Sequence, residues 1–122
     1  MARPPKGSAV RLSPRFRIYC GGDVALGPGK VELLRTIQET GSIRQAAFNL
    51  QMSYMRAWKL IKTMNTCFKS PLVNAARGGL KRGGAKLTPR GITVLKLYER
   101  LATESQSATE QTWRELEGLL RR

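Results

Sequence analysis

Histidine is absent from this sequence of 122 residues, and acidic residues are few. Without histidine, the chain lacks both the most common general base and the most common metal ligand of proteins. There are 8 Asp and Glu residues against 22 Lys and Arg residues, and four of the seven glutamates lie in the last 19 residues. No close carboxylate pair stands in a cleft-like sequence context, so the sequence predicts no enzyme.

Cysteines and long apolar runs are also scarce. Cys20 and Cys67 are too far apart to supply the paired spacing of zinc ligands, and we expect two reduced thiols. No stretch approaches the ~20 apolar residues of a membrane span, and the first residues lack the apolar run of a signal peptide. We expect no metal, no cofactor, no identifiable small-molecule effector site, no membrane contact, and a cytoplasmic, nucleoid-associated location.

Positive charge is what the sequence has in excess, with a formal net charge of +14. The hydrophobic fraction of 41% is sufficient for a folded core. On such a chain this charge favours nucleic acid as a partner over a merely solubilising surface. Three blocks contain basic residues and no acid, namely 1–20, 53–70 and 77–90. We expect the fold to bring these blocks toward one face.

The first third of the chain divides into short segments. Residues 1–14 are rich in proline, glycine and basic residues, which indicates a flexible basic arm. Alternating residues predict a strand over 15–19, and a turn leads to a returning strand over 24–26. A helix over 28–40 follows, with a proline in its first turn and a glycine directly after its end.

Residues 42–61 have the physical requirements of a helix-turn-helix. Ser42 and Gln45 predict a capping box that opens a short second helix, and Ser53 predicts the cap of a third helix over about 53–68. Gln51 stands where many such turns carry glycine in the left-handed conformation. Taken alone, the segment is equally typical of two packed helices in an all-α core.

A basic, glycine-rich segment follows the third helix. We expect strands over 72–76 and 85–87, with residues 77–84 forming a wing between them. The segment lacks the Gly-Lys-Ser/Thr of a phosphate-binding loop, and a plain solvated turn is the second interpretation. We therefore predict a mainly α protein with a small β component. Its fold is a winged helix-turn-helix with an N-terminal strand or hairpin and a long C-terminal helix.

The residues after Pro89 predict that two copies of the chain associate. The helix starting near Pro89 has an apolar face wider than one small domain can cover, and Leu116 and Leu120 follow a polar interval. Two copies could bury this surface around a two-fold axis. We expect a DNA-binding domain over 15–101, and a helical extension over 102–122 that forms a homodimer.

Several short motifs occur in unbroken order across residues 15–101. They are Gly41-Ser42-Ile43, Ala46-Ala47, Met52-Ser53-Tyr54, Ala57-Trp58, Met64-Asn65, the glycine-rich segment and Leu87-Thr88-Pro89-Arg90-Gly91. As a set they resemble the N-terminal DNA-binding domain of the ModE family of molybdate-responsive regulators. The resemblance implies a winged helix-turn-helix in a dimeric bacterial transcription factor whose long terminal helices help form the dimer. Family members that sense molybdate carry a C-terminal oxyanion-binding region, which we expect this sequence to lack.

These observations predict a transcriptional regulator that binds double-stranded DNA sequence-specifically. The recognition helix would enter the major groove, and the wing over 77–86 would contact the backbone or the minor groove. The alternative is a non-specific architectural nucleoid or RNA-binding module. We expect Tyr54 and Trp58 to serve packing in large part. The predicted DNA-contacting residues are Arg44, Ser53, Tyr54, Met55, Arg56, Lys59, Lys62, Arg77, Lys81, Arg82 and Lys86.

Overall fold

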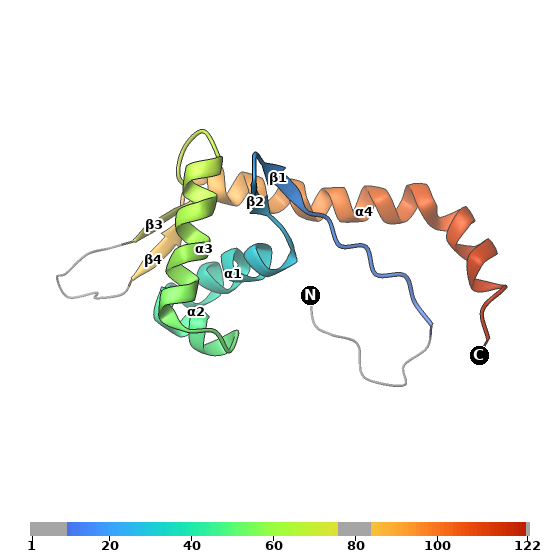
Figure 1. Cartoon of the computed structure of the whole chain (residues 1–122), viewed down its shortest axis with the longest axis horizontal. Helices are drawn as coiled ribbons and strands as arrows, with labels where there is room; N and C mark the ends of the chain where they lie inside the picture. The colour runs from blue at the N-terminus through green and yellow to red at the C-terminus, as the bar shows by residue number, and fades with distance from the viewer. Residues whose placement is uncertain (1–9, 76–83, 122) are drawn as a thin grey trace.

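The computed structural model describes residues 10–75 and 84–121. Within these ranges, four helices and two pairs of short antiparallel strands follow one another (Figure 1). The elements are β1 (Ile18–Cys20), β2 (Asp23–Leu26), α1 (Pro28–Thr40), α2 (Ile43–Asn49), α3 (Tyr54–Cys67), β3 (Val73–Ala75), β4 (Ala85–Leu87) and α4 (Pro89–Glu117). The predicted mainly α winged helix-turn-helix with a long C-terminal helix is thereby confirmed.

The N-terminal hairpin is shorter than the sequence predicted. Strand β1 begins at Ile18, which pairs with Leu26, and the segment 15–17 lies outside the ladder. The reason is that β2 ends at Leu26 and α1 begins two residues later, so residues before Ile18 have no partner strand. The turn passes through Gly21 at φ 61°, a conformation that glycine adopts without steric cost.

Local signals fix the ends of α1 and the start of α2. Gly41 ends α1 with φ 70°, and the Ser42 hydroxyl accepts a hydrogen bond from the Gln45 backbone N–H. The predicted capping box forms only in this half. The Gln45 side chain donates instead to Asn49 Oδ1, and the Ser42 N–H donates to the Thr40 hydroxyl.

The turn between α2 and α3 has the expected left-handed residue. Gln51 has φ 57°, so a polar side chain occupies the position where glycine would be least strained. Ser53 then caps α3 by accepting a hydrogen bond from the Arg56 backbone N–H. The predicted helix-turn-helix geometry is therefore present.

Asn65 joins α3 to the strand pair that follows it. Its Oδ1 accepts hydrogen bonds from the backbone N–H groups of Leu72 and Val73, and its Nδ2 donates to the Val73 carbonyl. Strands β3 and β4 are antiparallel, with Val73 opposite Leu87. An isolated bridge between Ser42 and Gly84 ties the residue before β4 to the residue before α2.

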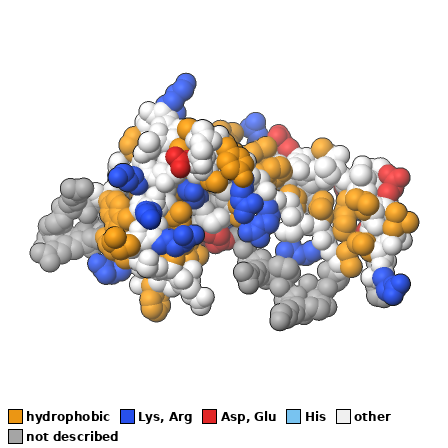
Figure 2. All heavy atoms as spheres, in the orientation of Figure 1, with side chains coloured by type: hydrophobic (Ala, Val, Ile, Leu, Met, Phe, Trp, Pro, Cys, Tyr) orange, Lys and Arg blue, Asp and Glu red, His pale blue; other side chains and the backbone are white. Residues whose placement is uncertain are grey.

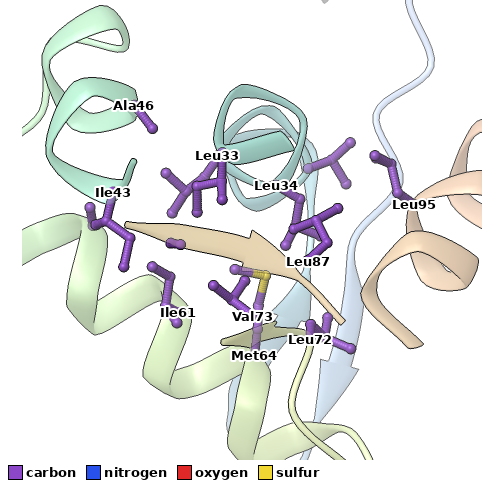
Figure 3. Close-up of a cluster of buried hydrophobic side chains, with 14 of the residues drawn as sticks. Leu33, Leu34, Ile43, Ala46, Ile61, Met64, Leu72, Val73, Leu87 and Leu95 are labelled. Carbon is purple, nitrogen blue, oxygen red and sulfur yellow. The ribbon is translucent and has the colours of Figure 1, made fainter. Parts of the chain in front are cut away.

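Apolar side chains from all four helices and from β3 and β4 meet in one buried cluster (Figure 3). Burial of these side chains is the main favourable term that holds α3 in a fixed orientation. The labelled members are Leu33, Leu34, Ile43, Ala46, Ile61, Met64, Leu72, Val73, Leu87 and Leu95.

Helix α4 runs for 29 residues without a break, and its distal half extends away from the other helices (Figure 1). Its buried residues are Gly91 and Leu95, both near its start. Gly91 packs so closely on the Leu72 backbone that a Cβ atom there would collide with the carbonyl group. Among the described residues, no helix is long and apolar enough to cross a membrane.

Candidate nucleic-acid interface

Helix α3 has one buried face and one exposed face. Ala57, Ile61 and Met64 are buried against the core. Successive residues of an α-helix are rotated by about 100° around its axis. Four side chains, separated in sequence by four, three and four residues, therefore point away from the core. These exposed side chains form what we call the outer ridge of α3: Met55, Lys59, Lys62 and Thr66.

The outer ridge lies in an acid-free part of the chain. No Asp or Glu occurs between Glu39 and Glu99, a stretch that includes α2, α3, β3 and β4. Lys59 and Lys62 form no ion pair with any described residue. Figure 2 shows Lys and Arg side chains gathered over this region, interleaved with hydrophobic ones. Such a surface is complementary to a polyanion.

Arg56 lies on the flank of α3, about 100° around the helix from Met55. It is exposed and, within the described residues, forms no side-chain ion pair. The positive charge of Arg56 interacts electrostatically with Lys30 on α1. Partial burial lowers the pKa of Lys30, the Arg56 guanidinium lowers it further, and Asp23 opposes both.

Lys30 was not among the residues predicted from the sequence to contact DNA. A single lysine in the first turn of a helix belongs to no recognisable motif. The structure brings Lys30 within electrostatic range of Arg56, and also of Asp23 and the Cys67 thiol. Positive charge from α1 and α3 therefore meets the Asp23 carboxylate here.

Arg44 on α2 and two aromatic residues on α3 form a connected group. The Arg44 guanidinium carbon lies 4.6 Å from the centre of the Tyr54 ring, and Tyr54 meets Trp58 edge-to-face at 6.2 Å between ring centres. Both aromatic side chains are half-buried and pack on the core. Arg44 is exposed. Its cation–π contact orients it beside the start of α3.

The structure describes only part of the predicted wing. Lys86 is exposed on β4, between the buried side chains of Ala85 and Leu87, so it points away from the core. Arg77, Lys81 and Arg82 lie outside the described residues. Ser53 lies at the start of α3, where its hydroxyl is already engaged as the helix cap.

The two cysteines are neighbours in space, which the sequence did not reveal. The Cys20 Sγ lies 4.0 Å from the Cys67 carbonyl oxygen, and both thiols are free. Burial raises the pKa of the Cys67 thiol, and its hydrogen bond with Cys20 acts in the same direction. Within the described residues, no group of three His, Cys, Asp or Glu residues is placed to hold a metal ion.

Sequence comparison relates the chain to bacterial regulators. The family model of bacterial regulatory helix-turn-helix proteins of the lysR family matches residues 29–92. The molybdenum transport protein ModE of Azotobacter vinelandii is 36% identical over 85% of this chain and 38% of its own length. The transcriptional regulator ModE of Yersinia pestis is 46% identical over 66% of this chain and 31% of its own length. The chain thus spans about a third of the length of these relatives.

Solved structures share the fold. The DNA-binding domain of BenM in a complex with benA site 1 DNA has a TM-score of 0.52 at 19% identity, over 70% of this chain and 94% of its own. ArgP from Mycobacterium tuberculosis has a TM-score of 0.50 at 22% identity, over 70% of this chain and 30% of its own. At these identities the likeness extends to the fold alone.

Proposed function

The chain belongs to the lysR family of bacterial regulatory helix-turn-helix proteins, and on that premise we propose that it binds double-stranded DNA sequence-specifically as a transcriptional regulator. Relatives are named transcriptional regulators, and one of them, from Escherichia coli, is named a DNA-binding transcriptional dual regulator. In this proposal α3 enters the major groove, where an α-helix fits and base edges are distinguishable.

The observation that carries the proposal is the outer ridge of α3. Its two lysines are exposed and form no ion pair with a described residue, while the opposite face of the helix is fixed in the core. A rigid helix with such a face can bring several charges to successive phosphates at once, and release of their counterions favours binding.

The proposal extends to the other predicted contacts. In the proposal Arg44 and Arg56 flank the ridge, and Ser53 and Tyr54 lie at the helix start, nearest to the groove. Lys86, exposed on β4, approaches the backbone. The proposal also includes Arg77, Lys81 and Arg82, which lie outside the described residues. Tyr54 contributes mainly by orienting Arg44.

We also propose a homodimer. Helix α4 exposes Leu97, Leu101 and Leu116, with exposed fractions of 49%, 41% and 55%. An open groove of about 300 Å³ lies beside the first two, with Ile18 and Phe68 among its walls. Burying these side chains against a second copy would remove apolar surface from water and place two copies of α3 for a palindromic site. Residues 15–101 then carry the DNA contacts, and residues 102–122 help join the copies.

Enrichment of a random duplex library with the full chain tests the function. We expect one family of sequences to be preferred over random duplex by ~10³-fold or more. Equal affinity for all duplexes would contradict specific recognition and favour the architectural module. Preference for RNA over duplex DNA would contradict the proposal as well.

A charge-matched pair of variants tests the role of α3. Lys59→Gln combined with Lys62→Gln should weaken binding and lower the slope of log K against log salt by about 0.9 for each phosphate that is no longer neutralised. Arg100→Gln combined with Arg114→Gln changes the net charge equally but lies on α4. Both pairs are measured on a duplex with a single half-site, where dimerisation does not contribute, and this control should leave the slope unchanged. Equal effects from both pairs would show that only total charge matters.

A further inference from the structure

Met55 is the one large hydrophobic side chain that α3 exposes, with 77% of its surface accessible. It is the second residue of the helix and the first of the outer ridge. Large apolar side chains gain free energy by burial, and those of α3 on the opposite face are buried. Met55 therefore does not contribute to the packing of the core.

The surroundings of Met55 are suited to a nucleic-acid groove. Lys59 follows one helical turn later and Lys62 two turns later on the same ridge. A shallow hollow runs along this side of the helix, with walls that include Met55, Trp58 and both lysines. The Ser53 cap fixes the first turn of the helix, so the backbone that carries Met55 is held in place.

The chemistry of the side chain limits what it can read. A thioether has no hydrogen-bond donor and is only a weak acceptor, so Met55 cannot discriminate base edges by hydrogen bonding. The major groove offers one apolar group that differs between bases, the C5-methyl group of thymine. A flexible, polarisable side chain can pack against such a methyl group.

We propose that Met55 is a specificity-determining residue that packs against the C5-methyl group of a thymine in each half-site. This inference rests on the proposed function, because it requires α3 to lie in the major groove. Lys59 and Lys62 supply the affinity for phosphates, and Met55 supplies a preference for thymine at one position.

The experiment removes the methyl group from the DNA instead of from the protein. The full chain first enriches its preferred duplex, and each thymine is then replaced singly by deoxyuridine. At one thymine per half-site we expect the affinity to fall about fourfold, the effect of one buried methyl group. For Met55→Ala and Met55→Gln, the same replacement should leave the affinity unchanged.

Phe48→Ala is the matched control. Phe48 is 78% exposed and lies on α2, outside the ridge, so this variant should keep the wild-type sensitivity to deoxyuridine. If no thymine matters to the wild type, or if both Met55 variants stay equally sensitive, the inference is overturned while the proposed function stands. If no duplex is enriched at all, the proposed function itself fails.

Circular dichroism and thermal melting complete the comparison. Both Met55 variants should keep the wild-type spectrum and melting temperature, because the side chain is exposed. A loss of structure in both variants would show that Met55 supports the fold, and would overturn the inference.

Discussion

Helix α3 and the part of α4 beyond Leu101 each expose a helical surface, but their charges are arranged differently. Helix α3 contains three basic residues and no acid, and its buried face fixes it in the core. The distal part of α4 has no buried residue, and its four glutamates outnumber its one arginine. Arg114 contacts Glu110 at 2.7 Å, and Arg100 contacts Glu104 at 3.4 Å, both four residues apart.

The difference indicates two kinds of partner. The uncompensated charge of α3 is favourable only beside an anion from outside the domain. The distal part of α4 has little positive charge to offer an anion, but α4 and the turn after it expose leucines, among them Leu116 at 55% and Leu119 at 84%. That surface is suited to an apolar partner, which the proposed dimer provides.

Removing residues 103–122 should give the largest effect of this comparison. We expect the dimer to dissociate at micromolar concentration, because the leucines at the end of α4 are removed. Affinity for a palindromic site should fall by roughly 10²–10⁴, since the two half-sites are no longer bound together. Affinity for a single half-site should be largely kept. Sedimentation equilibrium on both lengths measures the assembly.

The truncated chain should still unfold cooperatively, because every residue of the buried cluster precedes residue 103. A full-length chain that sediments as a monomer would contradict the proposal that the exposed leucines of α4 bind a second copy. Equal dimerisation of both lengths would place the interface before residue 103, at the groove beside Leu97 and Leu101.

Elements with local signals could be predicted closely from the sequence. Helix α1 and strand β4 have the predicted bounds, and the Ser53 cap forms as expected. These features depend on neighbouring residues: a proline at the helix start, a glycine at its end, and a hydroxyl three residues before a free N–H. The helix-turn-helix was predictable for the same reason.

Features that depend on distant segments could not be predicted. A long C-terminal helix and a helical extension over 102–122 were predicted, but the polar stretch over 103–112 has no apolar periodicity, and only the structure shows that α4 continues through it without a break. The proximity of Arg56 to Lys30 follows from how α1 packs beside α3. The contact of Cys20 with Cys67 likewise follows from how the hairpin of β1 and β2 packs beside α3.

Arg56→Ala tests whether the positive charge on the flank of α3 contacts DNA. We expect specific DNA binding to weaken by ~1–3 kcal/mol without a change in the fold, because Arg56 is exposed and forms no ion pair with a described residue. Lys96→Ala, at an exposed position on α4 before residue 102, is the control and should bind as the wild type does. Titration of the preferred duplex with each protein measures the difference. Wild-type affinity of Arg56→Ala would place Arg56 off the interface.

The thiol of Cys67, the last residue of α3, reports on how firmly that helix end is packed. Because burial raises its pKa, less thiolate is present at pH 8 than in the unfolded chain. Iodoacetamide should therefore modify Cys67 more slowly in the folded protein than in guanidinium chloride. The folded-state rate should rise as the pH approaches the raised pKa. Mass spectrometry of the alkylated peptides gives both rates, and equal rates would mean that this end of α3 is not packed.

The smallest effect should come from the ion pair between Arg114 and Glu110. Its side chains are 67% and 57% exposed, so water and salt screen the attraction. An exposed pair four residues apart stabilises a helix by about 0.2–0.5 kcal/mol. Glu110→Gln should therefore change the free energy of unfolding by no more than this amount, and the change should disappear at about 1 M salt, where the screening length is only about 3 Å. Thermal melts at low and high salt measure it. A loss above about 1 kcal/mol, beyond the range of exposed pairs, would mean that Glu110 contacts something beyond its own helix, which in a dimer would be the second copy of the chain.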